Sequence, residues 1–163
     1  MTNATAVAFG YPDTKVAETR CWMVLVRPKQ PTFGSLVLIC KETAQAFSDL
    51  SAEAFADLGV AVAGVETMLR GVVAYEKINY LMLMMVDRDV HFHVIPRYAG
   101  ERVHEGVSFP DAGWPAAPNL GDQLIAAYLR NLLVSFAIHR ARSSAVSSWH
   151  PPPGRRRPQQ TRG

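Results

Sequence analysis

Residues 89–97 read Asp-Val-His-Phe-His-Val-Ile-Pro-Arg, and the alternation in this stretch is typical of a half-buried β-strand. Successive side chains of a strand point to opposite faces of its sheet. A strand over 89–95 turns its valine and phenylalanine side chains toward a core. It places Asp89, His91 and His93 in one row on the other face. A carboxylate and two imidazoles in one row predict a functional site.

The sequence on either side of this stretch predicts the rest of an α+β domain. Short apolar and β-branched runs predict earlier strands over 15–19, 21–26, 35–40 and 78–86. Ser51 is a good N-cap for a main helix that ends near Gly71, and a second apolar stripe predicts a C-terminal helix over 122–138. A short helical turn is expected over 43–47. The order of elements indicates an α+β fold with a five-stranded antiparallel sheet, one main helix and a C-terminal helix.

The stretch 78–86 is apolar on both of its predicted faces. Such strands are buried on both faces, so we expect a cover on each side of this one. The second cover is either a partner subunit or the C-terminal helix folding back over the sheet. Asp87 and Arg88 are expected to form a tight turn into the motif strand.

The composition divides the chain into a globular part and a basic tail. A length of 163 residues, 48% of them hydrophobic, fits one domain with a real core. The formal net charge is +3, but six of the 17 basic residues lie beyond residue 138. This leaves 11 basic against 14 acidic residues before it, a charge of −3. We expect a domain over 1–138 and a disordered Ser/Pro/Arg-rich tail over 139–163.

Neither nucleic acid nor a membrane is an expected partner. Trp149 is the only aromatic residue of the basic tail. No stretch reaches the roughly 18 consecutive apolar residues of a membrane span, and the first twenty residues lack the pattern of a secretory signal. Cys21 and Cys40 lie in apolar runs and fit buried, reduced thiols better than a disulfide framework. These features predict a cytoplasmic protein.

The paired histidines favour phosphoryl chemistry. A neutral imidazole nitrogen is a good nucleophile toward phosphorus when an acceptor holds the other ring nitrogen in one tautomer. A second imidazole two residues away can donate to a phosphate oxygen or to the leaving group. Phosphoryl transfer also needs cations and donors around the charge, and candidates to supply them are Lys77, Asn79 and Arg97.

The stretch 89–97 resembles the signature of the histidine triad (HIT) family, His-x-His-x-His followed by apolar residues and often Pro-Arg. The resemblance covers about residues 9–135, and the segments 77–80 and 111–115 are similar to bacterial members. It implies a compact α+β subunit that forms a homodimer. It also implies hydrolysis or transfer at the α-phosphate of a nucleotide, with no required cofactor beyond a divalent metal that can accompany the substrate.

The resemblance also assigns roles to both histidines. The middle histidine of the signature, which forms a covalent nucleotidyl intermediate, corresponds to His91. The third, which contacts the phosphate, corresponds to His93. The expected enzyme is therefore a nucleotide phosphohydrolase or nucleotidyl transferase that acts on a nucleotide conjugate or a dinucleoside polyphosphate.

The sequence departs from the signature at several positions. Asp89 replaces the first histidine, Arg27 stands where many members have asparagine, and Ser35 stands where a histidine is frequent. The usual phosphate-contacting loop before the motif is absent. Asp89 either orients a neighbouring group as an acceptor or repels the phosphate, at a cost of about 1–4 kcal/mol. The candidate nucleotide- and phosphate-binding residues are Arg27, Ser35, Lys77, Asn79, Asp89 and Arg97.

Two other functions are compatible with these residues. Asp89, His91 and His93 are a ligand set that zinc and non-haem iron use, but positions 89 and 93 of a strand are about 13 Å apart, too far to share one ion easily. A metal-dependent enzyme is thus the less favoured alternative. The other is a catalytically weak nucleotide-binding or dimeric interaction protein on the same fold.

Overall fold

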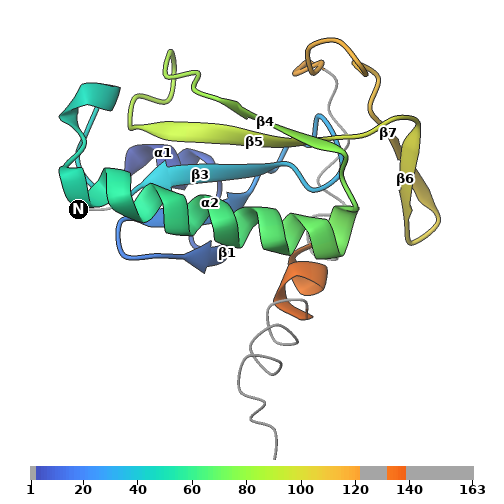
Figure 1. Cartoon of the computed structure of the whole chain (residues 1–163), viewed down its shortest axis with the longest axis horizontal. Helices are drawn as coiled ribbons and strands as arrows, with labels where there is room; N and C mark the ends of the chain where they lie inside the picture. The colour runs from blue at the N-terminus through green and yellow to red at the C-terminus, as the bar shows by residue number, and fades with distance from the viewer. Residues whose placement is uncertain (1–2, 122–131, 139–163) are drawn as a thin grey trace, which may run out of the picture.

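A five-stranded antiparallel sheet forms the centre of the molecule (Figure 1). The computed structural model describes residues 3–121 and 132–138. The sheet has the order β1-β2-β3-β5-β4. Its strands are β1 (Lys15–Glu18), β2 (Trp22–Val26), β3 (Leu36–Cys40), β4 (Lys77–Leu81) and β5 (His91–Arg97). The predicted α+β class and five-stranded antiparallel sheet are confirmed.

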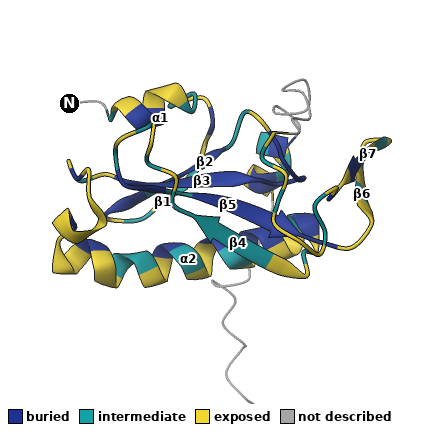
Figure 2. Cartoon of the chain, turned by 90° about the horizontal axis from the view of Figure 1, so that it is seen from above, coloured by how far each residue is buried: buried dark blue, intermediate teal, exposed yellow. Residues whose placement is uncertain are grey.

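Two helices lie on opposite faces of this sheet (Figures 1 and 2). The long helix α2 (Ala52–Val73) packs against the larger core, and the short helix α1 (Ala4–Ala8) contributes Ala6 to a smaller core on the other face. Ser51 caps α2 as predicted, its Oγ accepting the N–H of Ala54 at 3.0 Å. The helix continues past Gly71 to Val73, and its C-cap Ala74 has a left-handed φ of 51°.

The chain between β4 and β5 differs from the prediction. β4 ends at Leu81 and β5 begins at His91, so residues 82–90 form a loop. The strand predicted over 78–86 is therefore confirmed for 78–81 and wrong for 82–86, and the tight turn predicted at Asp87 and Arg88 is wrong. The reason lies on the β3 side, where Val90 exchanges backbone hydrogen bonds with Ala44 and Cys40 at 3.0 and 2.9 Å. Those bonds draw the end of the loop toward β3.

Two smaller elements also differ from the prediction. The short helical turn is a 3-10 turn at Phe47–Asp49, not at 43–47, because the Asp49 carboxylate accepts the N–H of Ala46 at 3.1 Å. A hairpin of β6 (Glu101–His104) and β7 (Val107–Pro110) was not predicted. Its two-residue turn uses positive φ at both central positions, a geometry that matches the twist of paired strands.

The C-terminal part of the chain is described only in part. Residues 132–138 are helical, and Leu132 and Phe136 are buried in the core beneath α2. The remainder of the predicted helix, 122–131, and the predicted tail, 139–163, lie outside the described residues. In the described ranges no helix is long and apolar enough to span a membrane.

Candidate active site

β5 places His91 and His93 on the sheet face that carries α1. His91 pairs with Ile39 of β3 and His93 with Val37, and both partners belong to the smaller core. The alternating side chains of β5, such as Val94, pack in the larger core beneath α2. Both histidines are enclosed, with 0% and 6% of their surfaces exposed. The predicted alternation thus holds for the two histidines.

The predicted strand began at Asp89, but Asp89 lies outside β5, and only the two histidines share that strand. The residue precedes β5, where strand alternation does not apply. Its carboxylate Oδ2 instead accepts the backbone N–H of Thr5 in α1 at 3.1 Å. Its own N–H donates to the Thr5 hydroxyl at 3.2 Å. Asp89 therefore joins the β4–β5 loop to α1.

The His91 ring is held by the main chain. Its Nδ1 donates to the carbonyl oxygen of Asp89 at 2.7 Å. A carbonyl can only accept, so in the neutral ring the proton lies on Nδ1 and the lone pair on Nε2. That Nε2 is buried and has no hydrogen-bond partner among the described residues. An imidazole in this state is ready to act as a nucleophile.

His93 is a neutral neighbour of His91 at neutral pH. The two ring centroids are 5.0 Å apart, and the rings are nearly perpendicular. Burial, followed by the proximity of His91 and Arg27, lowers the pKa of His93 to about 4. Its Nδ1 is buried without a partner in the described part of the chain. A bound phosphate would raise this pKa and favour proton donation by His93.

A cavity of about 510 Å³ opens onto His93. Its walls come from the end of α1, the segment after β2 and the β4–β5 loop; the lining residues besides His93 are Ala8, Phe9, Arg27, Pro28, Lys29, Leu83, Met85, Val86 and Asp87. The ring centroid of Phe9 is 5.9 Å from that of His91 and 5.6 Å from that of His93. Apolar walls with a few charged groups are typical of small-molecule sites. A second cavity, of about 470 Å³, lies between α2 and β1 and contains neither histidine.

The charged side chains that line the cavity favour the binding of an anionic ligand. Arg27 and Lys29 supply two cations and Asp87 one carboxylate. The Arg27 guanidinium donates through Nη1 to the Lys29 carbonyl, and its Nε is buried with no partner among the described residues. Burial lowers the pKa of Arg27, while Asp87 opposes that shift. An arginine keeps its charge in proteins, so Arg27 contributes a positive charge to the cavity wall.

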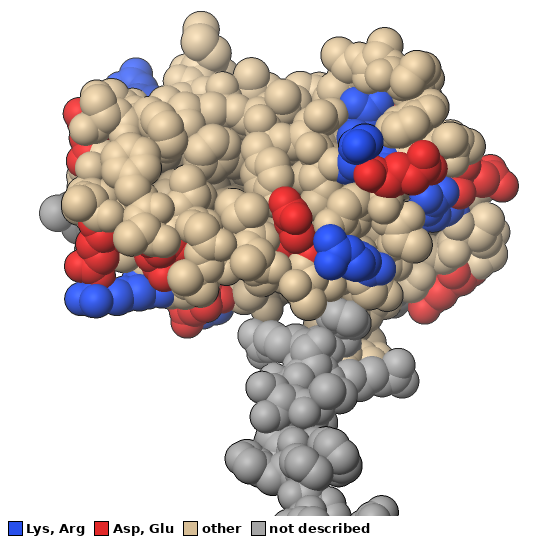
Figure 3. Space-filling view, viewed as in Figure 1, with Lys and Arg blue, Asp and Glu red and all other residues tan. Residues whose placement is uncertain are grey.

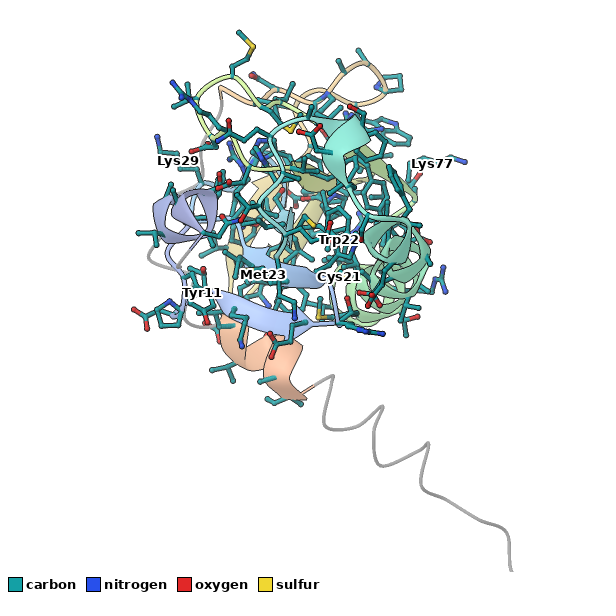
Figure 4. The ribbon with its side chains drawn as sticks, turned by 90° about the vertical axis from the view of Figure 1, so that its left-hand side faces the viewer. Tyr11, Cys21, Trp22, Met23, Lys29 and Lys77 are labelled. Atoms are coloured by element: carbon teal, nitrogen blue, oxygen red, sulfur yellow. The ribbon has the colours of Figure 1, made fainter. Side chains whose placement is uncertain are left out.

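The other predicted phosphate-binding residues lie away from this cavity. Arg97 forms a buried ion pair with Asp111 at 2.6 Å and donates to Asn79 Oδ1 at 2.8 Å. Lys77 is the first residue of β4, lies opposite Arg97 of β5 in the strand register, and is exposed. Figure 4 shows Lys77 and the cavity residue Lys29 on opposite sides of the molecule.

Ser35 is buried in the loop before β3. Its hydroxyl donates to the Thr32 carbonyl at 2.8 Å, and its N–H donates to Gln30 Oε1 at 2.9 Å. These bonds brace the loop that follows β2. Of the predicted binding residues, the structure therefore brings only Arg27 together with His93 at the cavity.

Sequence reasoning missed the cavity walls. It did not find α1, which supplies Ala8 and Phe9, because five residues are too few to show a periodic stripe. Asn3 was the available signal, since its Oδ1 caps α1 by accepting the N–H of Ala6 at 2.8 Å. Lys29 and Asp87 lie in loops, where no pattern predicts which way a side chain points.

The donor set for the metal-dependent alternative is not assembled here. Within residues 3–121 and 132–138, no group of three or more His, Cys, Asp or Glu side chains is placed to hold a metal ion. The Asp89 carboxylate is turned toward Thr5 instead.

Comparison with solved structures identifies the fold. A histidine triad protein from Sinorhizobium meliloti is 19% identical and has a TM-score of 0.63, with 85% of this chain and 96% of that chain covered. A hypothetical histidine triad nucleotide-binding protein from Sulfolobus tokodaii is 17% identical, with a TM-score of 0.59 and coverage of 79% and 84%. A Plasmodium falciparum diadenosine triphosphate hydrolase is 11% identical, with a TM-score of 0.55 and coverage of 82% and 78%.

The histidine triad fold that the resemblance of residues 89–97 implied is borne out by these structures. By sequence, no protein-family model and no curated protein matches the chain. The five-stranded sheet and the helix beneath it are nonetheless a known arrangement. This protein has the fold of the histidine triad proteins.

Proposed function

We propose that this protein is a nucleotide phosphohydrolase or nucleotidyl transferase that acts at the α-phosphate of a nucleotide conjugate or dinucleoside polyphosphate. The observation that carries the proposal is His91, whose Nδ1 is bonded to a carbonyl and whose buried Nε2 has no partner among the described residues. Solved structures of the same fold include a nucleotide-binding protein and a diadenosine triphosphate hydrolase by their own descriptions.

In the proposed reaction the Nε2 lone pair of His91 attacks the α-phosphorus. An Nε2–P bond forms, and the bond from phosphorus to the leaving group breaks, the electron pair departing with that group. His93 donates a hydrogen bond or a proton to the phosphate or the leaving group. Water, or another acceptor in the transfer reaction, then attacks the same phosphorus and releases His91. Arg27 and Lys29 stabilise the charge of the phosphates.

No resident cofactor enters this scheme, although a divalent metal can arrive with the substrate phosphates. Two free, buried thiols, Cys21 and Cys40, support the cytoplasm as the place of action.

The test is to trap the intermediate. The wild-type protein is mixed with adenosine phosphoramidates and with diadenosine polyphosphates, quenched within milliseconds and digested for mass spectrometry. We expect an acid-labile nucleotidyl group on the peptide that contains His91. If turnover occurs and no quench time yields this adduct, the covalent route is wrong.

The burial of His91 favours one second candidate, a nucleotide-binding protein with little catalysis. The ring is fully enclosed, with Phe9 against it, so a substrate in the cavity meets His93 first. Micromolar nucleotide affinity by calorimetry, with no product after prolonged incubation, would select this candidate.

We also propose that the protein is a homodimer. β4 is an edge strand in the described sheet, and the loop after it exposes 88% of Met85 and 87% of Val86. The upper left and centre of the face in Figure 3 carry few charged side chains. Edge strands with apolar surroundings favour pairing with a second chain.

A further inference from the structure

Asp89 occupies a position between α1 and the nucleophile. Its carboxylate and its N–H both bond Thr5, at 3.1 and 3.2 Å, and Thr5 is itself buried. Its carbonyl accepts the Nδ1–H of His91 at 2.7 Å. One residue therefore contacts the short helix with two groups and the reactive ring with a third.

The peptide unit that bears this carbonyl is held from both sides. Downstream, the N–H of Val90 belongs to the same peptide unit and donates to the Ala44 carbonyl at 3.0 Å. Upstream, the orientation of residue 89 depends on its pair of bonds with Thr5. Removing that pair leaves the carbonyl fixed at one end only.

The bonds to Thr5 also place α1. The helix is only five residues long, and Asn3, Ala6 and Phe9 tie it to the sheet: Asn3 Nδ2 donates to the Cys40 carbonyl at 3.2 Å, and Ala6 lies in the smaller core. Phe9 follows α1 directly and lies against both histidine rings. Movement of Thr5 would therefore move the wall that encloses His91.

We infer that Asp89 is a positioning residue, whose hydrogen bonds to Thr5 hold the carbonyl that fixes the His91 tautomer and the helix that encloses the ring. This inference rests on the proposed function of His91 as the nucleophile. It gives the carboxylate at position 89 a purpose other than contact with the phosphate or with a metal.

The test compares three variants. Asp89→Ala removes the carboxylate, and Asp89→Asn keeps an oxygen that can accept from Thr5. Asp57→Ala is the matched control, because Asp57 also joins two elements through a threonine hydroxyl and a backbone N–H: Thr19 and Cys21 donate to it at 2.6 and 2.7 Å. Asp57 lies in α2, beneath the other face of the sheet.

The first measurement needs no substrate. Nitrogen NMR of the histidine side chains reports which ring nitrogen of His91 carries the proton. We expect a single Nδ1–H form in the wild type, in Asp89→Asn and in Asp57→Ala, and a mixture of tautomers in Asp89→Ala. The second measurement is turnover of an adenosine phosphoramidate, for which we expect kcat to fall about 10-fold in Asp89→Ala with KM within about twofold, and to recover in Asp89→Asn.

The two readouts separate this inference from the proposed function. If Asp89→Ala keeps the single tautomer and its kcat stays within twofold of wild type, the inference is overturned even where trapping on His91 succeeds. If tautomers mix in Asp89→Ala and no nucleotide is turned over by the wild type, the inference stands and the proposed function fails. Should Asp89→Ala not fold, Thr5→Val, which removes only the hydroxyl acceptor, is judged by the same two readouts.

Discussion

At the scale of single residues, the acceptor that orients His91 is a main-chain carbonyl two positions earlier in the chain. A side chain at position 89 does not have to reach the ring for this bond to form. Asp89, at the position where the resemblance expects the first histidine of the signature, is therefore compatible with the ring orientation that the proposed nucleophile needs. The sequence predicted the two histidines and their shared face, but it could not predict where the Asp89 carboxylate turns, because that depends on α1.

His91→Asn should reduce kcat by at least about 10³-fold, because an amide cannot form the nucleotidyl intermediate. The measurement is steady-state turnover of adenosine phosphoramidates, with circular dichroism to verify folding. His93→Asn is the companion variant and should lose about 10²–10³-fold, the scale for one donor to developing charge. Near-normal turnover by His91→Asn with every substrate of the wild type would contradict the mechanism.

The low pKa of His93 predicts an acid-sensitive fold. Burial lowers this pKa from about 6.5 in the unfolded chain to about 4 in the folded one. Between these values the unfolded chain binds more protons, so the stabilisation is complete above pH 6.5 and is lost as pH falls toward 4. From pH 7 to pH 5 this histidine should cost about 2 kcal/mol of unfolding free energy.

Urea unfolding at pH 7 and pH 5 measures this loss. In His93→Gln the decrease between the two pH values should be smaller than in the wild type by about 2 kcal/mol. An equal decrease in both proteins would mean that His93 is not the group that titrates.

At the scale of elements, the sequence predicts best where packing is regular. Four predicted strands begin and end within about two residues of those observed, because three of them, β2, β3 and β5, carry buried side chains along most of their length. The strand predicted over 78–86 is wrong in its second half. Its apolar residues do not reveal that Val90 is already hydrogen-bonded to Cys40 and Ala44. The helix α1 and the β6–β7 hairpin are too short to leave a periodic signal.

The turn before β3 offers a prediction about packing. Gly34 has a φ of +83°, and an added Cβ would lie 2.4 Å from Val73 Cγ2 at the end of α2. Gly100 has a φ of +70° and open space around it, so it is the matched control for backbone strain alone. Gly34→Ala should lower the unfolding free energy by about 1–3 kcal/mol more than Gly100→Ala does. If urea unfolding shows that the two variants lose the same unfolding free energy, backbone strain alone accounts for the cost of Gly34→Ala.

At the scale of the whole molecule, a buried ion pair joins the sheet to the segment after β7. The Arg97 and Asp111 side chains are 4% and 1% exposed, and Asp111 also accepts the N–H of Tyr98 at 3.3 Å. Asp111→Ala would leave the guanidinium buried and uncompensated, at a cost of about 3–5 kcal/mol. Glu18→Ala, which removes an exposed partner of Lys15, should cost less than about 1 kcal/mol.

Thermal and urea unfolding of the two variants give this comparison directly. A loss in Asp111→Ala no larger than that in Glu18→Ala would show that Arg97 is solvated or finds another partner.

The proposed homodimer is the second prediction at this scale. We expect static light scattering to give twice the chain mass of 18.0 kDa at micromolar concentrations. The exposed apolar loop after β4 would lose solvent in such an assembly, which supplies the driving force. A monomer mass throughout this concentration range would contradict the proposal and leave the loop as part of the cavity rim alone.

The residues that line the cavity come from segments that tolerate substitution to different degrees. His93 comes from a central strand, whereas the remaining lining comes from the end of α1 and from two connecting segments. Connecting segments tolerate insertion and exchange far better than the strands they join. Ligand preference in proteins of this architecture can therefore diversify by remodelling the rim, while the two histidines of β5 stay in register. A laboratory selection for new substrates should accumulate its changes in residues 27–29 and 82–88, and spare β5.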